Sequence, residues 1–284
     1  MRRAALLGAC LLCATPAGAQ GPKPVVRGHT LDADGAVRVW NLVGAVRVTG
    51  WARDSVALVA RAPADASLYM GGGHRGVKLG VEERGGASPP ADLELRVPRG
   101  ANLWIKTASA EVTVRGVTGP VEVYAVTGAV RVAGRPSTLR VESLAGPVTV
   151  DDGADWLRAR TSSGALTVRG AVGDAQLATV GGALTLEGDV RQRATLETVT
   201  GPVRQRGTVA RGATLAIDTN SGEVTLRPAA DAALDLLSVV GRLTSARPAV
   251  RAATRAEGKG QGARVAGAGG RVEVRSFKGA IVVE

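Results

Sequence analysis

A glycine recurs at nearly constant intervals through the middle of this chain, and each copy stands between two short runs in which small apolar residues alternate with polar ones. The spacing is constant along Gly128, Gly146, Gly164 and Gly182, and it lengthens slightly along Gly201, Gly222 and Gly241. A period of about 20 residues with strand-like alternation is typical of a solenoid, in which stacked copies of one unit bury together an apolar face that no copy can bury alone.

The alternation on both sides of the glycine predicts two strands per repeat. Around Gly164, Leu157 and Ala159 precede the glycine and Leu166 and Val168 follow it, and one residue separates the members of each pair. This is the period of a strand with one buried face. We expect the glycine to occupy a tight corner between the two strands, where it accepts a positive φ without a Cβ clash.

The same frame extends beyond the regular series. Valines flank Gly44 near the N-terminus and Gly279 near the C-terminus in the same way, and Ala110 takes the glycine position of another repeat. The sequence therefore predicts an all-β fold: a parallel β-helix or β-solenoid of about ten coils, with an 18–21-residue period and right-handed connections. Residues 28–284 are predicted to form one domain with irregular insertions near 55–100 and 247–268.

Successive coils are expected to stack as parallel neighbours about 4.8 Å apart, giving a rod of roughly 45 to 50 Å. Open strand edges at the ends of such a rod invite association, and residues 55–100 and the terminal strand are the candidates for blunting them. Aromatic residues make up only 2% of the chain, which fits a narrow interior filled by aliphatic side chains.

Two columns of hydroxyl residues follow from the same frame. Three residues before the glycine, on the inward face, a small side chain such as Ser143 or Thr161 is predicted to bond the corner backbone. Three residues after it, on the outward face, threonines such as Thr149 and Thr167 are frequent. An ice-binding surface would need a second regular threonine column, but the adjacent column is charged and uneven, so β-propensity explains these threonines better.

Residues 1–19 have the composition of a secretory signal peptide. Arg2 and Arg3 form a basic start, an apolar stretch follows, and small residues precede Gln20. A lipid anchor at Cys10 is an alternative reading. Cys10 and Cys13 both lie in this segment, so the mature chain is predicted to lack thiols and disulfides and to be exported to the periplasm or the cell exterior.

Removing Arg2 and Arg3 leaves 34 basic against 25 acidic side chains. This excess favours polyanionic partners such as acidic polysaccharide, other envelope polymers or anionic lipid headgroups. The basic residues are scattered among acidic ones, and export argues in the same direction, so nucleic acid is not an expected partner. The apolar stretch of the leader is too short to span a bilayer, and no transmembrane segment is predicted in the mature chain.

The sequence yields no convincing catalytic, cofactor-binding or metal-binding residues. His29 and His74 lack the partners that a metal site or a triad requires. The glycines of 71–76 match a dinucleotide-binding pattern, but a strand-like run follows them where that motif needs a helix. Three carboxylates, Asp151, Asp152 and Asp155, crowd one corner and could bind a cation weakly.

The chain resembles a bacterial family of exported β-strand-repeat proteins, a domain of unknown function often labelled "putative adhesin". The resemblance is carried by the stretches 35–51, 93–103 and 276–283 and by the serial Ser/Thr-x-x-Gly-x-Val-x-Val units. It implies a β-solenoid in the cell envelope or outside the cell. The family brings no catalytic residues. The basic segment 247–268 lies outside its pattern.

These observations favour a non-enzymatic envelope or secreted protein that serves as an adhesin or scaffold surface. Trp40, Trp104 and Tyr124 fall at outward positions and could stack on sugars. Two alternatives stay open. One is an enzyme acting on polysaccharide, which would need a groove at Glu122, Arg140 and Glu142. The other is a structural polymer formed by end-to-end association.

Overall fold

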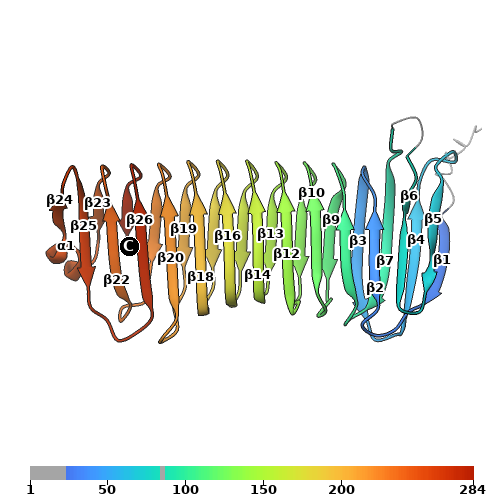
Figure 1. Cartoon of the computed structure of the whole chain (residues 1–284), viewed down its shortest axis with the longest axis horizontal. Coiled ribbons are helices and arrows are strands. Elements are labelled where there is room, and N and C mark those ends of the chain that lie inside the picture. The colour runs from blue at the N-terminus through green and yellow to red at the C-terminus, as the bar shows by residue number, and fades with distance from the viewer. Residues whose placement is uncertain (1–23, 84–86) are drawn as a thin grey trace, which may run out of the picture.

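The computed structural model describes residues 24–83 and 87–284. The fold is all-β, with 59% strand and 2% helix, and it consists of two long, mostly parallel sheets. The sheets lie face to face and run the length of an elongated body, with the N-terminal strands at one end and the red C-terminal strands at the other (Figure 1). The predicted signal peptide, with Cys10 and Cys13, lies outside the described residues.

Sheet A has 13 strands. In spatial order they are β1 (Val25–Thr30), β4 (Ser55–Arg61), β7 (Ala91–Pro98), β3 (Gly44–Trp51), β9 (Glu111–Arg115), β11 (Val130–Ala133), β13 (Val148–Asp151), β15 (Leu166–Arg169), β17 (Leu184–Glu187), β19 (Val203–Arg206), β21 (Val224–Arg227), β27 (Ile281–Val283) and β23 (Leu243–Ser245).

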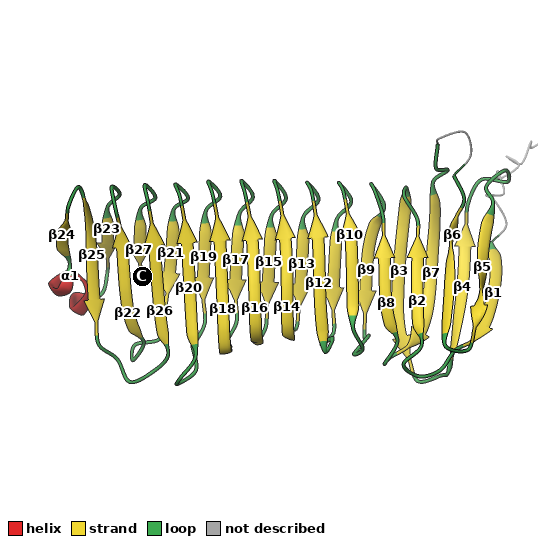
Figure 2. Ribbon diagram, viewed as in Figure 1, coloured by secondary structure: helices red, strands yellow, loops and turns green. Residues whose placement is uncertain are grey.

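Sheet B has 14 strands. In spatial order they are β24 (Arg255–Glu257), β25 (Gly260–Val265), β22 (Ala233–Ser238), β26 (Arg271–Ser276), β20 (Thr214–Thr219), β18 (Val190–Thr198), β16 (Val172–Thr179), β14 (Ala154–Thr161), β12 (Thr138–Ser143), β10 (Val121–Ala125), β8 (Asn102–Lys106), β2 (Ala36–Trp40), β6 (Gly76–Val81) and β5 (Leu68–Gly73). Helix α1 (Pro248–Ala253) lies near the C-terminal end (Figure 2).

Through the central part of the chain, successive strands alternate between the two sheets, and short loops join them along two edges of the body (Figure 2). We call one such pair of strands a coil. Each strand pairs in parallel with its equivalent one repeat away: Leu139 lies opposite Val121 on one side and Leu157 on the other. Equivalent positions therefore form columns along the body. The inward columns are the predicted aliphatic ones, and their members are almost completely buried.

The recurring glycine is required for a different reason from the one predicted. Gly128, Gly146, Gly164 and Gly182 do not have positive φ, whereas Gly44 at the start of β3 does. Several other positive-φ glycines, such as Gly134, follow the second strand of a repeat. At the recurring position the coils approach too closely for a side chain. A Cβ on Gly146 would lie 2.1 Å from the carbonyl oxygen of Gly128 in the neighbouring coil. Glycine is needed here for close backbone approach.

Most members of the inward hydroxyl column bond the corner backbone, as predicted, whereas buried Thr107 Oγ1 has no hydrogen-bond partner among the described residues. Ser143 Oγ donates to the carbonyl oxygen of Gly146 at 2.8 Å, and Thr161 Oγ1 donates to that of Gly164 at 2.6 Å. Both side chains are less than a tenth exposed. These bonds satisfy polar groups that the corner would otherwise bury without partners.

One inward position departs from the aliphatic pattern. Gln205 is 1% exposed and lies between Leu186 and Leu226 in the neighbouring coils. Its Nε2 donates to the carbonyl oxygen of Gly207 at 3.2 Å, whereas its Oε1 has no hydrogen-bond partner among the described residues. The interior thus contains a buried polar atom that costs folding free energy.

The coils are not stacked in sequence order at the ends, where the prediction of consecutive neighbours is wrong. Of the last two strands of the chain, β26 lies between β20 and β22, and β27 lies between β21 and β23. The first coil, β2 and β3, similarly lies inside β6 and β7. An ion pair of 3.1 Å between Arg275 and Asp235 links β26 to β22, and hydrogen bonding to Arg275 lowers the pKa of Asp235.

The irregular segments form the two ends of the body. Within 55–100, β4 pairs antiparallel with β7, and β5 pairs antiparallel with β6. Within 247–268, α1 is followed by β24 and β25, and β25 pairs antiparallel with β22. The terminal strand β27 does not blunt an end, contrary to expectation, because it lies inside the sheet.

Candidate binding surface on sheet B

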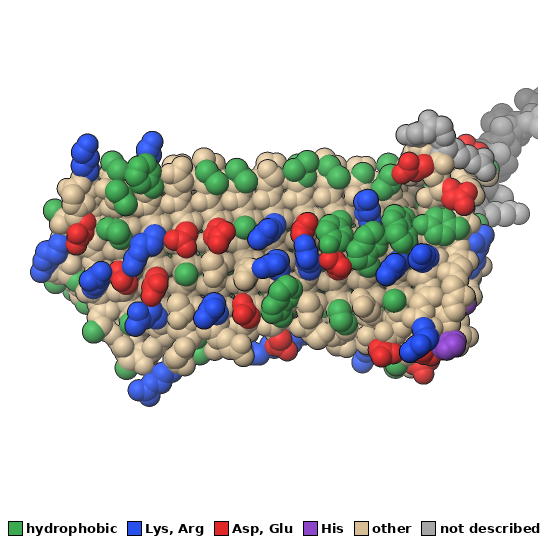
Figure 3. All heavy atoms as spheres, viewed as in Figure 1, with side chains coloured by type: hydrophobic (Ala, Val, Ile, Leu, Met, Phe, Trp, Pro, Cys, Tyr) green, Lys and Arg blue, Asp and Glu red, His purple; other side chains and the backbone are tan. Residues whose placement is uncertain are grey.

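Three aromatic side chains form a continuous row on the outward face of sheet B, and we call them the aromatic strip: Trp40 on β2, Trp104 on β8 and Tyr124 on β10. The ring centroids of Trp40 and Trp104 are 4.9 Å apart, and those of Trp104 and Tyr124 are 5.9 Å apart. The rings are tilted by 53° and 50° relative to each other. Figure 3 shows hydrophobic side chains gathered over this part of the face, flanked by basic ones.

The strip arises from strand alternation combined with register. Trp104 lies opposite Arg38 of β2, and Lys106 of β8 lies opposite both Trp40 and Tyr124. The three rings are therefore diagonal neighbours across adjacent strands, within reach of one another on one face. The sequence predicted the outward direction of each ring, but not that the three would touch.

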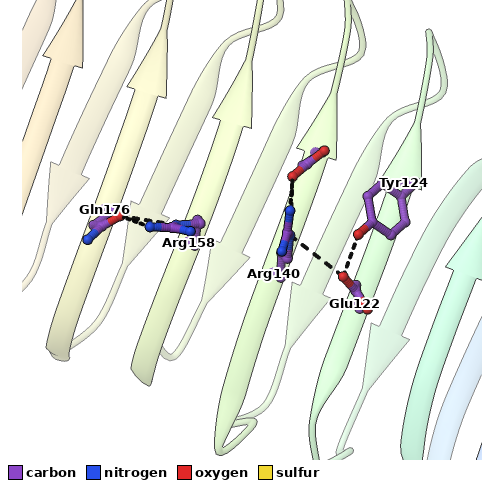
Figure 4. Close-up of polar contacts among 6 residues, drawn as sticks. Glu122, Tyr124, Arg140, Arg158 and Gln176 are labelled. Atoms are coloured by element: carbon purple, nitrogen blue, oxygen red, sulfur yellow. Dashed lines mark hydrogen bonds and ion pairs between the residues drawn. The ribbon is translucent and has the colours of Figure 1, made fainter.

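A polar cluster continues the strip toward the C-terminus. Tyr124 donates its hydroxyl proton to Glu122, and Arg140 donates to Glu142 through Nε at 3.1 Å and Nη2 at 2.6 Å (Figure 4). Arg140 Nε also lies 3.6 Å from Glu122 Oε1. The hydrogen bond to Glu122, aided by burial, raises the pKa of Tyr124, and the hydrogen bond to Glu142 raises the pKa of Arg140.

The structure thus brings Glu122, Arg140 and Glu142 together, as a polysaccharide-acting enzyme would require. Both carboxylates, however, are directed at the same guanidinium (Figure 4). None of the clefts described below is lined by any of the three residues. In a glycosidase two carboxyl groups flank the bond that is cleaved, so the substrate must fit between them. The three side chains thus form one ion-pair cluster that is partly exposed on the outward face of sheet B.

The polar row extends further along the sheet. Arg158 on β14 donates through Nε to Gln176 of β16 at 3.0 Å (Figure 4). The guanidinium of Arg158 also lies 5.8 Å from the ring of Trp156 on the same face. The outward face of sheet B therefore presents aromatic rings and side-chain donors and acceptors over several consecutive coils.

The other sequence-based candidates do not converge. Asp151 pairs with Arg169 at 3.2 Å, Asp155 pairs with Arg135 at 2.8 Å, and Asp152 accepts a hydrogen bond from the backbone N–H of Gly134. These carboxylates already have positive or donor partners. Within residues 24–83 and 87–284 no group of three or more His, Cys, Asp or Glu side chains could hold a metal ion.

The two histidines lie in different segments at the N-terminal end of the body. His29 lies on β1 opposite Val56 of β4, and His74 lies in the turn between β5 and β6. The carbonyl oxygen of His74 accepts a hydrogen bond from the backbone N–H of Asp32 at 2.7 Å, but neither histidine belongs to a group of three metal-ligating side chains among the described residues.

One exposed feature was missed by the sequence analysis. At the position two residues before the glycine, apolar side chains form a ridge along one edge of the body, visible at the upper edge in Figure 3. Leu144 is 58% exposed, Val180 51% and Phe277 48%. A trough of about 850 Å³ runs beside the ridge, and charged side chains such as Arg160 and Asp218 also line it. The repeat frame contained this signal, since the same position is apolar in most repeats.

Comparison with known proteins identifies the fold. No protein-family model matches the chain, and no curated protein matches it in sequence. Three solved bacterial structures share its fold. One, from Parabacteroides distasonis, is described as a "putative lipid binding protein"; it has a TM-score of 0.56 at 12% identity, and the match covers 92% of this chain and 96% of that one.

The other two are described as "putative adhesins". The protein from Parabacteroides merdae gives a TM-score of 0.52 at 10% identity, with 92% and 96% of the two chains covered. The second Parabacteroides distasonis protein gives 0.52 at 9% identity, with 93% and 98% covered. The resemblance to adhesin-labelled bacterial proteins is thereby confirmed at the level of the fold.

Helix makes up only 2% of the structure. Among the described residues, no helix has the length and apolarity needed to cross a membrane.

Proposed function

We propose that this protein is exported and acts without catalysis, as a rigid β-solenoid whose surface contacts envelope or extracellular polymers. In this proposal residues 1–19 are removed, residues 28–284 form one domain, and the coils follow one another with right-handed connections. The protein works in the periplasm or at the cell surface. Acidic polysaccharide is the preferred partner, because the mature chain carries more basic than acidic side chains.

The observation that carries the proposal is the aromatic strip on an open sheet face. Trp40, Trp104 and Tyr124 present large, partly exposed rings near basic side chains such as Arg38 and Lys106. Aromatic rings pack against the apolar faces of sugar rings, and the flanking cations and carboxylates can bond hydroxyl and acidic groups. The strands beneath the strip, β2, β8 and β10, are each paired on both sides, so we expect little conformational freedom to be lost on binding.

A polymer also suits the length of the sheet. A sheet of 13 strands extends about 58 Å at the usual strand spacing. A polymer lying along it can make many weak contacts at once, and their combined affinity greatly exceeds that of each contact.

The experiment is retention of the purified mature protein on immobilised glycans across a salt series. Trp104→Ala should reduce retention several-fold, whereas Phe277→Ala, which removes an exposed aromatic side chain in the loop after β26, away from the strip, should change it little. Circular dichroism of both variants checks that the fold is intact. Equal retention of the two variants would remove the strip from the proposal, and turnover of a uronate panel would replace it with an enzyme.

The apolar ridge favours a second candidate, contact with lipid. Leu144, Val180 and Phe277 expose apolar surface in one line, and one protein of the same fold is described as a "putative lipid binding protein". Co-sedimentation with anionic vesicles that is lost in Leu144→Ser and Phe277→Ser, but kept in Trp104→Ala, would support lipid over glycan.

The structural-polymer alternative has less support from the ends of the sheets. Three of the four sheet edges end in an antiparallel pair: β1 with β4, β5 with β6, and β24 with β25. At the fourth edge β23 pairs in parallel with β27, but helix α1 packs against β23. The central coils pair with one another in parallel through both sheets. A coil of a second copy would not find open edges for parallel pairing in both sheets at either end of the body.

A further inference from the structure

A basic hollow lies on the outward face of sheet A, the sheet opposite the aromatic strip. Thr49 on β3 pairs with Arg96 of β7 on one side and with Arg115 of β9 on the other. Arg47 and Trp51 stand two residues before and after Thr49 on the same face of β3. The short side chain of Thr49 is thus surrounded by the four long side chains of Arg47, Trp51, Arg96 and Arg115. We call these five residues the Thr49 hollow.

The hollow is a depression of the surface. Its volume is about 570 Å³, within the range of small-molecule sites. The depth comes from small side chains surrounded by large ones, because Ala57 and Val59 of β4 also line it. Strand β4 belongs to the irregular segment that ends the body, so the hollow forms only where this segment joins the first coil.

The three arginines of the hollow have no counter-ion among the residues that the structure describes. Among the described residues, no carboxylate lies within 4.0 Å of the guanidinium of Arg47, Arg96 or Arg115, whereas other arginines on the same sheet pair with Asp151. Glu94 is the acidic residue that lines the hollow, and it pairs with Arg61 at 2.8 Å. Three unpaired cations around one depression repel one another, and a bound anion relieves that repulsion.

The side chain of Trp51 in the hollow is held in place. Trp51 Nε1 donates to the carbonyl oxygen of Ser55 at 2.8 Å, and the guanidinium of Arg53 lies 5.2 Å from the ring centroid. A ring fixed by a hydrogen bond offers a ready surface for a flat or cyclic ligand at little entropic cost. The Thr49 hydroxyl adds a donor and an acceptor at the floor.

We propose that the Thr49 hollow binds one anionic sugar unit, a ring that bears a carboxylate, sulfate or phosphate group. The guanidinium fork matches such groups through paired, charge-assisted hydrogen bonds. The ring of the sugar lies against Trp51, and a ring hydroxyl bonds Thr49. The inference rests on the proposed contact with envelope polymers for the source of the ligand, but the site is separate from the aromatic strip.

The test measures binding of short oligosaccharides to the mature protein by isothermal titration calorimetry. The probes are a uronate oligomer, a sulfated and a phosphorylated oligosaccharide, a neutral one of equal length, and inorganic phosphate. Arg115→Gln should weaken binding of the preferred acidic probe about tenfold, the loss expected for one charge-assisted contact. Arg115→Lys should lose part of that affinity, since lysine keeps the charge but not the fork.

The matched control is Arg227→Gln. Arg227 lies on the same sheet, in the same column of the repeat, and likewise forms no ion pair with a described residue. Its replacement removes the same charge far from the hollow and should leave binding unchanged. Equal weakening by Arg115→Gln and Arg227→Gln would mean a diffuse charge effect and would overturn the inference. Binding of phosphate as tight as that of the acidic sugar would overturn the sugar part.

The two proposals fail in different ways. If Trp104→Ala lowers glycan retention while Arg115→Gln leaves acidic-probe binding intact, the aromatic strip stands and the hollow does not. If Arg115→Gln abolishes binding of an acidic oligosaccharide while Trp104→Ala has no effect on retention, the hollow stands and the strip does not.

Discussion

Replacing Gly182 with alanine probes the close approach of backbones at the repeated corner. A Cβ on Gly182 would lie 2.0 Å from the carbonyl oxygen of Gly164 in the neighbouring coil. Ordinary van der Waals contact begins at 3.4 Å, so the two atoms would overlap severely. The preceding residue, Gly181, provides the matched control, because a Cβ there would meet only Thr200 Oγ1 at 3.6 Å.

The cost follows from what the overlap forces to move. The nearby backbone N–H groups of Val180 and Gly181 donate to the carbonyl oxygen of Ser162 at 3.1 and 2.9 Å, and that of Gly182 donates to Thr179 Oγ1 at 3.0 Å. Separating the coils strains or breaks the two bonds to Ser162, and shifting the corner strains the bond to Thr179. Overpacking costs about 1–3 kcal/mol, and a lost hydrogen bond about 1 kcal/mol more.

We therefore expect Gly182→Ala to lower the free energy of unfolding by about 2–4 kcal/mol. Gly181→Ala should be neutral or slightly stabilising, by up to about 1 kcal/mol, because alanine restricts the unfolded chain. Urea unfolding followed by far-ultraviolet circular dichroism compares the two. Equal stability of the two variants would refute the close-approach account.

Two further predictions concern the interior and the C-terminus. Gln205→Leu should raise the free energy of unfolding by about 1–3 kcal/mol, since it removes a buried unpaired oxygen and continues a column of leucines; a lower urea midpoint would contradict this. The backbone amide of Ile281, close to the chain end, should be protected from hydrogen exchange as strongly as the amides of the central coils. The reason is that β27 is paired on both sides and the Ile281 N–H donates to the carbonyl oxygen of Arg242 at 2.9 Å. Exchange as fast as that of the Val26 amide, in an exposed strand, would show that β27 does not lie between β21 and β23.

Much of the central fold follows from local pattern. Alternation with period two assigns Leu157, Ala159, Leu166 and Val168 to the interior, and the structure buries all four. The hydroxyl at Ser143 was likewise placed correctly, because a small polar side chain near a corner has few partners other than the corner backbone. The positive φ predicted for the glycine is wrong for Gly128, Gly146, Gly164 and Gly182. Their requirement for glycine comes from close contact between coils, which is a property of two segments one repeat apart and not of one turn.

The two candidate sites depend more on tertiary contacts than the central fold does. The outward directions of Trp40, Trp104 and Tyr124 were predictable, but their contact required the register between β2, β8 and β10. The Thr49 hollow had no sequence signal, since its arginines come from strands separated by irregular chain.

The sequence by itself determined the repeat length, the two strands per coil and the residues that face inward, because each of these depends on spacing within a few residues. Only the tertiary structure decided which coils are neighbours at the ends. The first and last coils lie one place inside the sheets, so that β3 and β27 each have a partner strand on both sides. This order depends on the packing of segments distant in sequence. That same order brings Arg96 and Arg115 to either side of Thr49.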